Sequence, residues 1–333
     1  MASSTPFIIL FGIFLLAVAL YAIVYAVVLI FKHSPRRPFP SEFTYLTNDD
    51  DTKGSSEKQK PNDLPFTREI DTADSTGIDL SVIVPCFNET KRLKLFLDDA
   101  LPVLNGMVDK TWELLLVDDG STDGTADYAI AWACEQNLAP GTLRVCRLEK
   151  NRGKGGAVAH GMRHFRGYYA IFADADGASR FADIARLMAA VDAEPAHSPV
   201  VAIGSRAHMV KTDAVVNRSF IRNFLMYGLH ALVYIFGIRS IGDTQCGFKM
   251  FTRPAANLIF PYMHTEGWIF DVEILIIALR KQIPVLEVPI SWHEVEGSKV
   301  ELARDSIKMA IDLVVMRLAY IIGVYSDQKL KNE

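Results

Sequence analysis

The sequence predicts an α/β protein built on a mostly parallel, doubly wound sheet with helices on both faces. Between residues 78 and 300, short apolar runs alternate with longer amphipathic segments, the pattern of strands followed by helices. Several of these runs have hardly a polar residue, which is typical of strands buried on both faces. Of the 333 residues, about 250 remain for this region once the segments before it are set aside, enough for one large core.

The first apolar segment, residues 7–31, predicts a transmembrane signal-anchor. It has about 25 residues without a charge, and a helix of that length spans a bilayer. A cleaved signal peptide is the alternative, but MASSTP has no Lys or Arg and the apolar stretch is longer than such a peptide needs. Because Lys32, Arg36 and Arg37 follow the segment and nothing basic precedes it, the positive-inside rule places the rest of this single-pass chain in the cytosol.

The segment after the anchor, residues 32–77, is rich in Pro, Asp, Ser and Lys, as in NDDDTKGSSEKQKPND. We expect it to be a flexible or partly ordered tether. The α/β domain is expected over residues 78–300. Residues 301–333 are expected to form an amphipathic helix and a tail.

The strands of the domain are predicted from apolar runs such as DLSVIVPCF and WELLLVDDG. Each is short, apolar at most positions and followed by turn residues. In chain order, the expected strands are 79–87, 112–120, 143–149, 168–176 and 200–206.

The helices are predicted from longer segments in which apolar residues recur at helical spacing, as in TKRLKLFLDDALPVLN. In chain order, the expected helices are 90–105, 125–137, 155–167 and 181–192. Residues 219–238 and 304–325 are apolar but interrupted by charged or polar residues. We expect both to be amphipathic helices that dock on the membrane surface, with core helices as the alternative.

Charge and cysteine content narrow the class of protein. A net charge of −4 argues against a nucleic-acid-binding protein, which normally carries a basic surplus. The four cysteines are scattered, with neither a CxxC motif nor a metal-binding spacing. They are expected to be reduced thiols, with a disulfide pair as the alternative.

Polar and acidic residues gather where three of the predicted strands end. These ends read PCFNET (85–90), DDGSTDGT (118–125) and DADGA (174–178). Ligands bind outside the carboxyl ends of the strands in such sheets, so we expect one shared site rather than three ordinary turns.

The acidic pair Asp174 and Asp176 predicts a metal site. In an extended chain, residues i and i+2 point to the same side, so both carboxylates can bind one divalent cation. Mg²⁺ prefers oxygen ligands and often bridges carboxylates to phosphates. The alternative is a solvated acidic turn.

The glycine-rich stretch NRGKGGAVAHG (151–161) lies between these ends. It matches neither the GxxxxGK[ST] loop nor the GxGxxG fingerprint. Nevertheless, a glycine-rich turn that carries Lys154 into a helix suits the binding of a phosphate or nucleotide.

Together these motifs resemble glycosyltransferase family 2, whose members are inverting enzymes with a GT-A fold. The resemblance covers about residues 79–300 and rests on VPCFNE, VDDGSTDGT, GKGGAV, the DAD doublet and DTQCGFKMF. Within the family, FADADGA, GSR, DTQCGFK and SWHEVEGSK behind one anchor are similar to the members that glucosylate dolichyl phosphate.

This narrower resemblance implies that glucose moves from UDP-glucose to dolichyl phosphate, with inversion, on the cytosolic face of the endoplasmic reticulum. The product would be the lumenal glucose donor for N-glycan precursor assembly. The alternatives are a polyprenyl-phosphate mannosyltransferase that uses GDP-mannose, and a non-catalytic membrane-anchored protein that binds nucleotide sugars.

The resemblance also implies roles for individual residues. Asp174 and Asp176 would hold Mg²⁺ or Mn²⁺ on the UDP diphosphate. Asp271 would orient the acceptor or act as a weak base, with Glu273 and Asp243 as competing candidates. The nucleotide-sugar-binding residues would be Pro85, Phe87, Glu89, Asp119, Lys154 and Asp174. The residues that bind the donor diphosphate or the acceptor phosphate would be Arg206, Arg222, Lys249 and Lys299.

Overall fold

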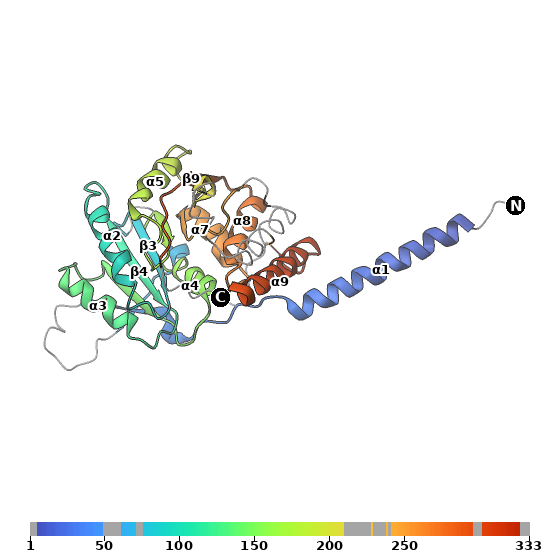
Figure 1. The fold of residues 1–333 in the computed structure, drawn as a ribbon, viewed down its shortest axis with the longest axis horizontal. Coiled ribbons are helices and arrows are strands. Elements are labelled where there is room, and N and C mark those ends of the chain that lie inside the picture. Colours follow the sequence, from blue (N-terminus) through green and yellow to red (C-terminus); the bar gives the residue numbers. More distant parts are fainter. Residues whose placement is uncertain are drawn as a thin grey trace.

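The computed structural model has one α/β domain and one long helix, α1 (Thr5–Phe31), which extends away from it (Figure 1). The structure describes residues 5–48, 61–70, 76–209, 241–295 and 302–326, together with residues 228 and 238. Within these ranges, residues 7–31 of α1 are the one helical stretch long and apolar enough to cross a membrane. The predicted anchor therefore coincides with a helix whose apolar side chains are mostly exposed.

The domain is built around one sheet, which has nine strands in the described residues. In spatial order they are β2 (Asn62–Asp63), β1 (Thr44–Thr47), β5 (Leu143–Arg147), β4 (Trp112–Asp118), β3 (Leu80–Cys86), β6 (Tyr169–Ala173), β8 (Phe248–Thr252), β7 (Val201–Ser205) and β9 (Val285–Pro289). All five strands predicted from the sequence are present.

The strand directions show a mixed sheet. The four central strands, β5, β4, β3 and β6, are parallel to one another, as predicted. β8, however, is antiparallel to both of its neighbours, β6 and β7, and β1 is antiparallel to β5. The expectation of a mostly parallel sheet therefore holds, because β7 and β9 are parallel to each other and run in the direction of the central strands, while β1 and β8 run the opposite way.

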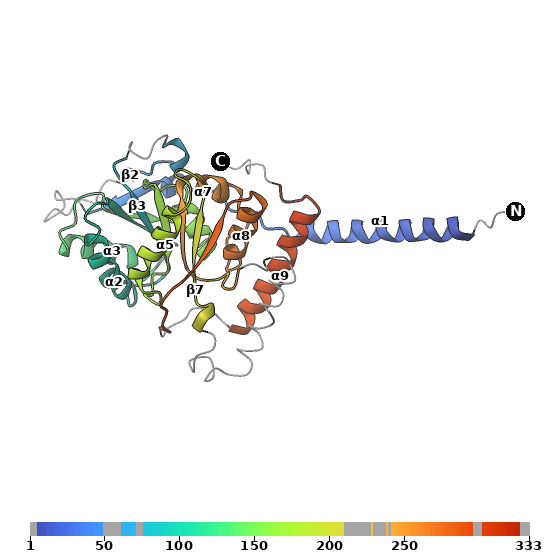
Figure 2. The same cartoon turned by 90° about the horizontal axis from the view of Figure 1, so that it is seen from above.

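Helices cover both faces of the sheet, as a doubly wound fold requires (Figures 1 and 2). One face packs against α2 (Leu93–Asn105), α3 (Thr125–Glu135) and α5 (Ile184–Asp192). The other packs against α4 (Lys154–Gly161), α7 (Arg253–Ile259), α8 (Phe270–Arg280) and α9 (Leu302–Ile321). β3 shows why both faces need cover, because Ile83 belongs to one core while Val82 and Val84 belong to the other.

Part of the predicted tether folds onto the domain. A short 3-10 helix (Pro40–Phe43) leads into β1, which pairs with β5 at Leu46–Val145 and Thr47–Arg144. Glu42 in this segment is completely buried. The chain after the anchor is thus attached to the sheet within about fifteen residues of the end of α1.

The helix α9 lies beside the base of α1, as both Figure 1 and Figure 2 show. One side of it, including Leu313, Met316 and Ala319, is buried in the core, whereas Ile307 and Ile311 are exposed. α9 is therefore a core helix with an exposed apolar strip. The other predicted membrane-surface helix, residues 219–238, lies outside the described residues except for positions 228 and 238.

Candidate active site

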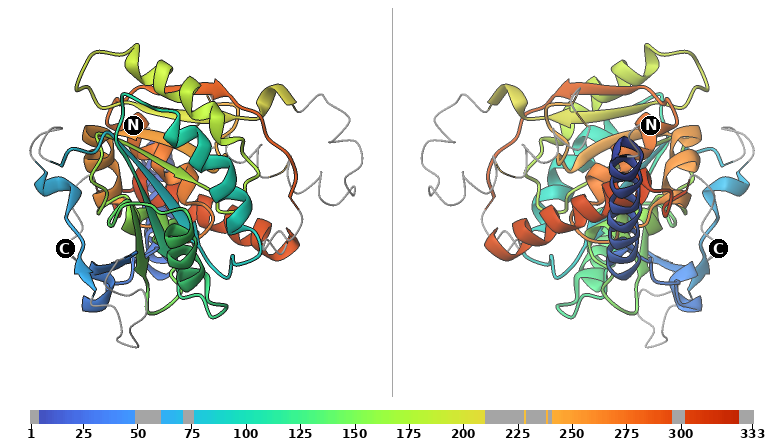
Figure 3. Two further views of the ribbon diagram at one scale, coloured as in Figure 1. Left: turned by 90° about the vertical axis from the view of Figure 1, so that its left-hand side faces the viewer. Right: turned by 90° about the vertical axis from the view of Figure 1, so that its right-hand side faces the viewer.

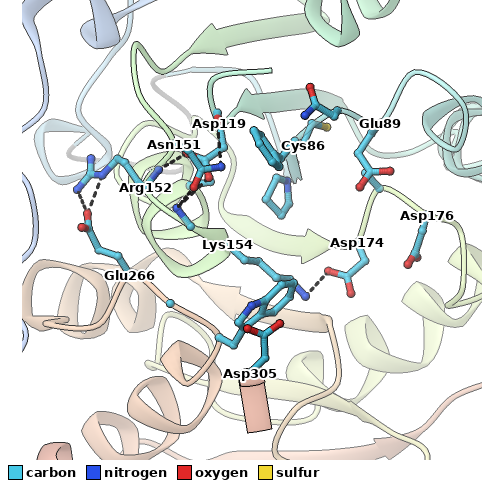
Figure 4. Close-up of a pocket in the computed structure, with 18 of the residues that line it drawn as sticks. Cys86, Glu89, Asp119, Asn151, Arg152, Lys154, Asp174, Asp176, Glu266 and Asp305 are labelled. Carbon is cyan, nitrogen blue, oxygen red and sulfur yellow. Dashed lines mark hydrogen bonds and ion pairs between the residues drawn. The ribbon is translucent and has the colours of Figure 1, made fainter. Parts of the chain in front are cut away.

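The carboxyl ends of the central strands open into a cavity of about 970 Å³. Its walls come from the ends of β3, β4 and β6, the turn before α4, and the loop before α8 (Figure 4). The cavity also reaches His33 and Ser34, which directly follow α1, and Asp305, Lys308 and Asp312 of α9. Figure 3, viewed along the length of the molecule, shows α1 projecting from the side of the domain that carries α9.

Most of the predicted site residues line this one cavity. The residues brought together there are Pro85, Phe87, Glu89, Asp119, Lys154, Asp174, Asp176 and Arg206. Lys249 and Asp271 are not among the described residues of its lining. Arg222 and Lys299 lie outside the part of the chain that the structure describes.

Asp119 is fixed by the glycine-rich turn. Its Oδ1 accepts a hydrogen bond from the backbone N–H of Arg152 at 2.7 Å, and its Oδ2 accepts one from Gly153 at 2.9 Å. Gly153 has a φ of +88°, a conformation that favours glycine. Burial outweighs these hydrogen bonds and raises the pKa of Asp119 to about 7. The group can therefore gain or lose a proton near neutral pH.

Glu89 and Asp176 share the guanidinium of Arg92. Arg92 donates to both carboxylate oxygens of Glu89, at 2.8 and 2.7 Å, and its Nη1 is 3.8 Å from Asp176 Oδ2. Arg92 lies three residues after Glu89, in the turn that leads into α2, and hydrogen bonds from Arg92 N and Leu93 N to the backbone oxygen of Glu89 close this turn. This arginine links the end of β3 to the acidic doublet that follows β6.

The doublet, Asp174 and Asp176, has the properties of a pair of metal ligands. Asp174 Oδ1 is buried and lies 2.6 Å from Lys154 Nζ, and no donor with good hydrogen-bond geometry reaches it within the described ranges. Asp176 Oδ1 accepts a hydrogen bond from Ala178 N at 3.0 Å. Burial and the charge of Asp174 raise the pKa of Asp176, so a cation beside the pair would relieve a real repulsion.

The protein side of such a site has two carboxylates. In the part of the chain that the structure describes, no group of three or more Asp, Glu, His or Cys side chains is placed to hold a metal ion. Two carboxylate ligands suit Mg²⁺ or Mn²⁺ when phosphate oxygens and water supply the remaining ligands. The residues present therefore fit a divalent cation that is shared with a diphosphate.

Lys249 and Asp271 form a buried ion pair next to this doublet. Lys249 Nζ is 2.5 Å from Asp271 Oδ1, and the two residues are 0% and 4% exposed. Burial raises the pKa of Asp271, with Lys249 and Lys154 opposing that rise. Asp271 and Asp174 both favour the charged form of Lys154. Asp271 thus influences the cavity through Lys249 and Lys154, and it is not itself among the described residues of the lining.

Glu273 and Asp243, the other candidates for the role of Asp271, each accept several hydrogen bonds from neighbouring residues. Glu273 accepts hydrogen bonds from His264, Thr265 and Tyr320. Asp243 accepts from Arg206 Nε and Nη2 at 2.7 and 2.9 Å, which holds its pKa low although burial acts in the opposite direction. The same guanidinium lies 5.5 Å from the ring centre of Trp292 in the cavity wall.

Several cavity residues were not predicted from the sequence, namely His33, Arg92, Arg152, Glu266, Trp268 and Trp292. Arg92 has a local signal, since Glu89-x-x-Arg92 is an i, i+3 ion pair at a helix start. The two tryptophans also had a signal, as large apolar side chains within the polar motifs EGWIFD and SWHEVEG. His33 and Glu266 had none, because tertiary structure alone brings them to the cavity.

The chain matches the model of "Glycosyl transferase family 2" over residues 81–260. It is 52% identical over 324 residues to the dolichyl-phosphate β-glucosyltransferase of Saccharomyces cerevisiae, covering 95% of each chain. It is 42% identical over 258 residues to the human enzyme of the same name, covering 76% of this chain and 79% of the human one.

Among solved structures, glucosyl-3-phosphoglycerate synthase from Mycobacterium tuberculosis, in complex with phosphoglyceric acid, has the same fold. The TM-score is 0.52 at 19% identity, over 76% of this chain and 84% of the other. This supports the expected GT-A-like architecture. The sequence matches go further, since they span the strand ends and loops that form the cavity. The chain is a glycosyltransferase that belongs to family 2 and, within it, to the family of the dolichyl-phosphate β-glucosyltransferases.

Proposed function

We propose that this enzyme transfers glucose from UDP-glucose to dolichyl phosphate, with inversion, on the cytosolic face of the endoplasmic reticulum membrane. One observation carries the proposal. A single cavity joins the acidic strand ends, with Asp119 and Asp174, to His33 and Ser34 at the end of a helix long enough to span a bilayer. A water-soluble donor and a membrane-bound acceptor can meet in a cavity of that kind.

On the donor side, Pro85, Phe87, Glu89 and Asp119 would bind the uridine. Lys154 begins α4, so its ammonium and the amino end of that helix would both face the diphosphate. Asp174 and Asp176 would hold a divalent cation there, which would neutralise charge on the departing diphosphate. The lysine and the doublet together would stabilise UDP as a leaving group.

On the acceptor side, the nucleophile is a phosphate monoester, whose second pKa is about 6. It is largely a dianion at neutral pH and needs to be positioned more than deprotonated. Its oxygen would attack the anomeric carbon from the face opposite UDP, forming one carbon–oxygen bond as the other breaks. Arg206 in the cavity wall, with Arg222 and Lys299, would hold the phosphates.

Asp271 would then act as an orienting group. It pairs with Lys249 and favours the charged form of Lys154, so we propose that the pair sets the position and charge of Lys154. In this proposal Lys249 acts on the phosphates through Asp271 and Lys154.

For the membrane, α1 would be the single span, with the basic residues after it on the cytosolic side. The exposed strip of Ile307 and Ile311 on α9 would rest on the same surface. The glucosylated lipid would serve as the lumenal glucose donor for assembly of the N-glycan precursor.

The test is a transfer assay with the purified full chain in detergent, dolichyl phosphate, and radiolabelled UDP-glucose or GDP-mannose. We expect label in the lipid phase from UDP-glucose, loss of that label with a chelator, and its return with Mg²⁺ or Mn²⁺. Label from GDP-mannose alone would overturn the choice of donor. Transfer that continues in the presence of the chelator would contradict the proposed need for a divalent cation.

A further inference from the structure

The chain that directly follows the anchor, residues 33–43, is bonded to the turn that holds Asp119. We call it the post-anchor segment. We infer that this segment is a working part of the donor site and that Arg36 in it is a positioning residue for nucleotide binding. The inference rests on the proposed function, because it takes the cavity between Asp119 and Lys154 as the place where the nucleotide binds.

The first contact is a three-residue junction of Arg36, Arg152 and Glu266. Arg152 Nε donates to Glu266 Oε1 at 2.7 Å, and its Nη2 donates to the backbone oxygen of Arg36 at 2.9 Å. The backbone N–H of Arg36 donates to Glu266 Oε2 at 3.2 Å. Figure 4 shows the Arg152–Glu266 pair beside the bonds from the turn to Asp119. Each of the three residues is therefore held by the other two.

The second contact is made by the buried carboxylate of Glu42. The guanidinium of Arg36 donates to its two oxygens, at 3.1 and 2.6 Å. The backbone N–H of Glu149, where the glycine-rich turn begins, donates to Glu42 Oε1 at 2.9 Å. Arg36 Nη2 also reaches the backbone oxygen of Lys150 at 3.3 Å. The turn, residues 149–153, is thus hydrogen-bonded to the post-anchor segment near both of its ends.

The turn has little room to move independently of these contacts. A Cβ built on Gly153 would lie 2.6 Å from the backbone oxygen of Glu266, and one on Gly155 would lie 2.9 Å from that of Gly267. The same turn supplies the two N–H groups that fix Asp119. A shift of the post-anchor segment would therefore be transmitted to Asp119 and to the start of α4.

His33 and Ser34, at the start of the same segment, line the substrate cavity. His33 is held by Tyr325, whose hydroxyl is 2.6 Å from His33 N, and by Asp312, 3.1 Å from its Nε2. The post-anchor segment is accordingly fixed at two points, α9 and the glycine-rich turn. An unattached linker would make neither set of contacts.

The experiment uses the full chain in detergent, which removes any effect of the bilayer. One variant is Glu266→Gln, which keeps the shape of a partly exposed side chain and removes its charge. A second is Arg36→Met with Glu42→Gln, made together because Arg36→Met alone would leave the buried carboxylate of Glu42 without its counter-charge. Arg186→Met is the control, since Arg186 is an exposed arginine of α5, lies outside the post-anchor segment and is not among the described residues lining the cavity.

Two measurements are made on each variant, and the first is UDP affinity in the presence of Mg²⁺ by calorimetry. We expect Kd to rise about tenfold in both test variants, as for the loss of a charge-assisted hydrogen bond, and to stay at the wild-type value in Arg186→Met. The KM for UDP-glucose should rise in parallel, with the KM for dolichyl phosphate within about twofold of wild type.

The second measurement is hydrogen exchange of the amides in residues 149–153. We expect faster exchange there in both variants and unchanged exchange in β3 and β4. A merely structural role would instead raise exchange throughout the domain. Wild-type UDP affinity and wild-type exchange in both variants would overturn the inference. If the wild-type chain bound no UDP, the proposed function would fail, while the exchange measurement would still test the attachment of the turn.

Discussion

The ammonium of Lys154, at the start of α4, lies 2.6 Å from Oδ1 of Asp174, at the end of β6. A second ion pair, Lys249 with Asp271, is buried next to it, so two positive and two negative side chains are grouped here. These four charges nearly cancel. A charged substrate or a cation that binds here therefore changes this balance of charge. Each of the four side chains can be substituted to measure its effect.

Removing the charge of Asp174 is the most direct prediction. We expect Asp174→Asn to lower glucose transfer about 100-fold or more and to abolish the metal dependence of UDP binding, because one of two carboxylate ligands is lost. Calorimetry with UDP, with and without Mn²⁺, measures this. Asp109→Asn, at an exposed acid outside the site, is the control. Unchanged metal-dependent binding in Asp174→Asn would contradict the assignment.

Gly247→Ala displaces Asp174 without changing any charge. A Cβ at Gly247 would lie 2.5 Å from Asp174 Cγ and clash with the carboxylate, so the carboxylate must move. We expect the Kd for UDP with Mn²⁺ to rise about tenfold, while the Kd for UDP alone changes less. Equal affinities for wild type and variant under both conditions would show that the position of Asp174 does not matter.

Asp271→Asn should act first on stability. The variant leaves the ammonium of Lys249 buried without a counter-charge, and we expect the free energy of unfolding to fall by about 3 kcal/mol. Chemical denaturation monitored by tryptophan fluorescence measures it. Lys249→Met with Asp271→Leu, which removes both charges, should regain most of the loss. Wild-type turnover by this folded double variant would contradict both the orienting and the base role of Asp271.

The pKa of Asp119 predicts a pH dependence of nucleotide binding. Burial raises it to about 7, so the carboxyl takes up a proton as the pH falls below that value. A nucleoside that donates a hydrogen bond to Asp119 favours the ionised form, so its affinity should fall on acidification from pH 8 to pH 6. Uridine is the suitable probe, because it has no phosphate that titrates in this range. Asp119→Asn should give a flat profile, and a flat wild-type profile would refute the role of Asp119.

The orientation of the chain can be tested by glycosylation. Asn88-Glu89-Thr90 fits the N-x-[ST] acceptor pattern, and a cytosolic domain would leave it unmodified. We expect no shift in mobility after endoglycosidase treatment of the membrane-bound chain. An acceptor site on a long extension added before α1 should be glycosylated in the same experiment. A glycan on the α/β domain would show that the domain faces the lumen, which would contradict the predicted orientation.

Local sequence pattern was sufficient for the part of the site that lies at the ends of central strands. Asp119 and Asp174 follow apolar runs that could hardly be anything but buried strands, and parallel strands bring their carboxyl ends to one edge. The motifs there depend on residues close together in the chain. The prediction therefore needed no knowledge of how distant segments pack.

The burial of Lys249 could not be read in the same way. Its strand, β8, is inserted antiparallel between β6 and β7, which places Lys249 opposite Phe172 and away from solvent. That insertion is a property of the topology and has no local signature. The FKMF run did offer a hint, because a lysine among large apolar residues in a strand is a candidate for burial.

The post-anchor segment was missed for a different reason. Its composition is polar and rich in proline, which is typical of a linker. Its order comes from a few buried groups, such as Glu42, which accepts a hydrogen bond from the backbone N–H of Glu149, 107 residues away. Averages over composition do not register such groups.

The cavity that reaches the end of α1 has a consequence for the kinetics of the enzyme. In the proposed function, the nucleotide sugar arrives by diffusion in three dimensions, whereas the lipid acceptor arrives by lateral diffusion in a plane. Because the proposed membrane span, α1, ends at the opening beside His33, the concentration that would govern acceptor binding is a surface density, the mole fraction of the lipid among its neighbours. Diluting the acceptor with inert lipid at constant total amount should therefore slow transfer, while adding more membrane of the same composition should not.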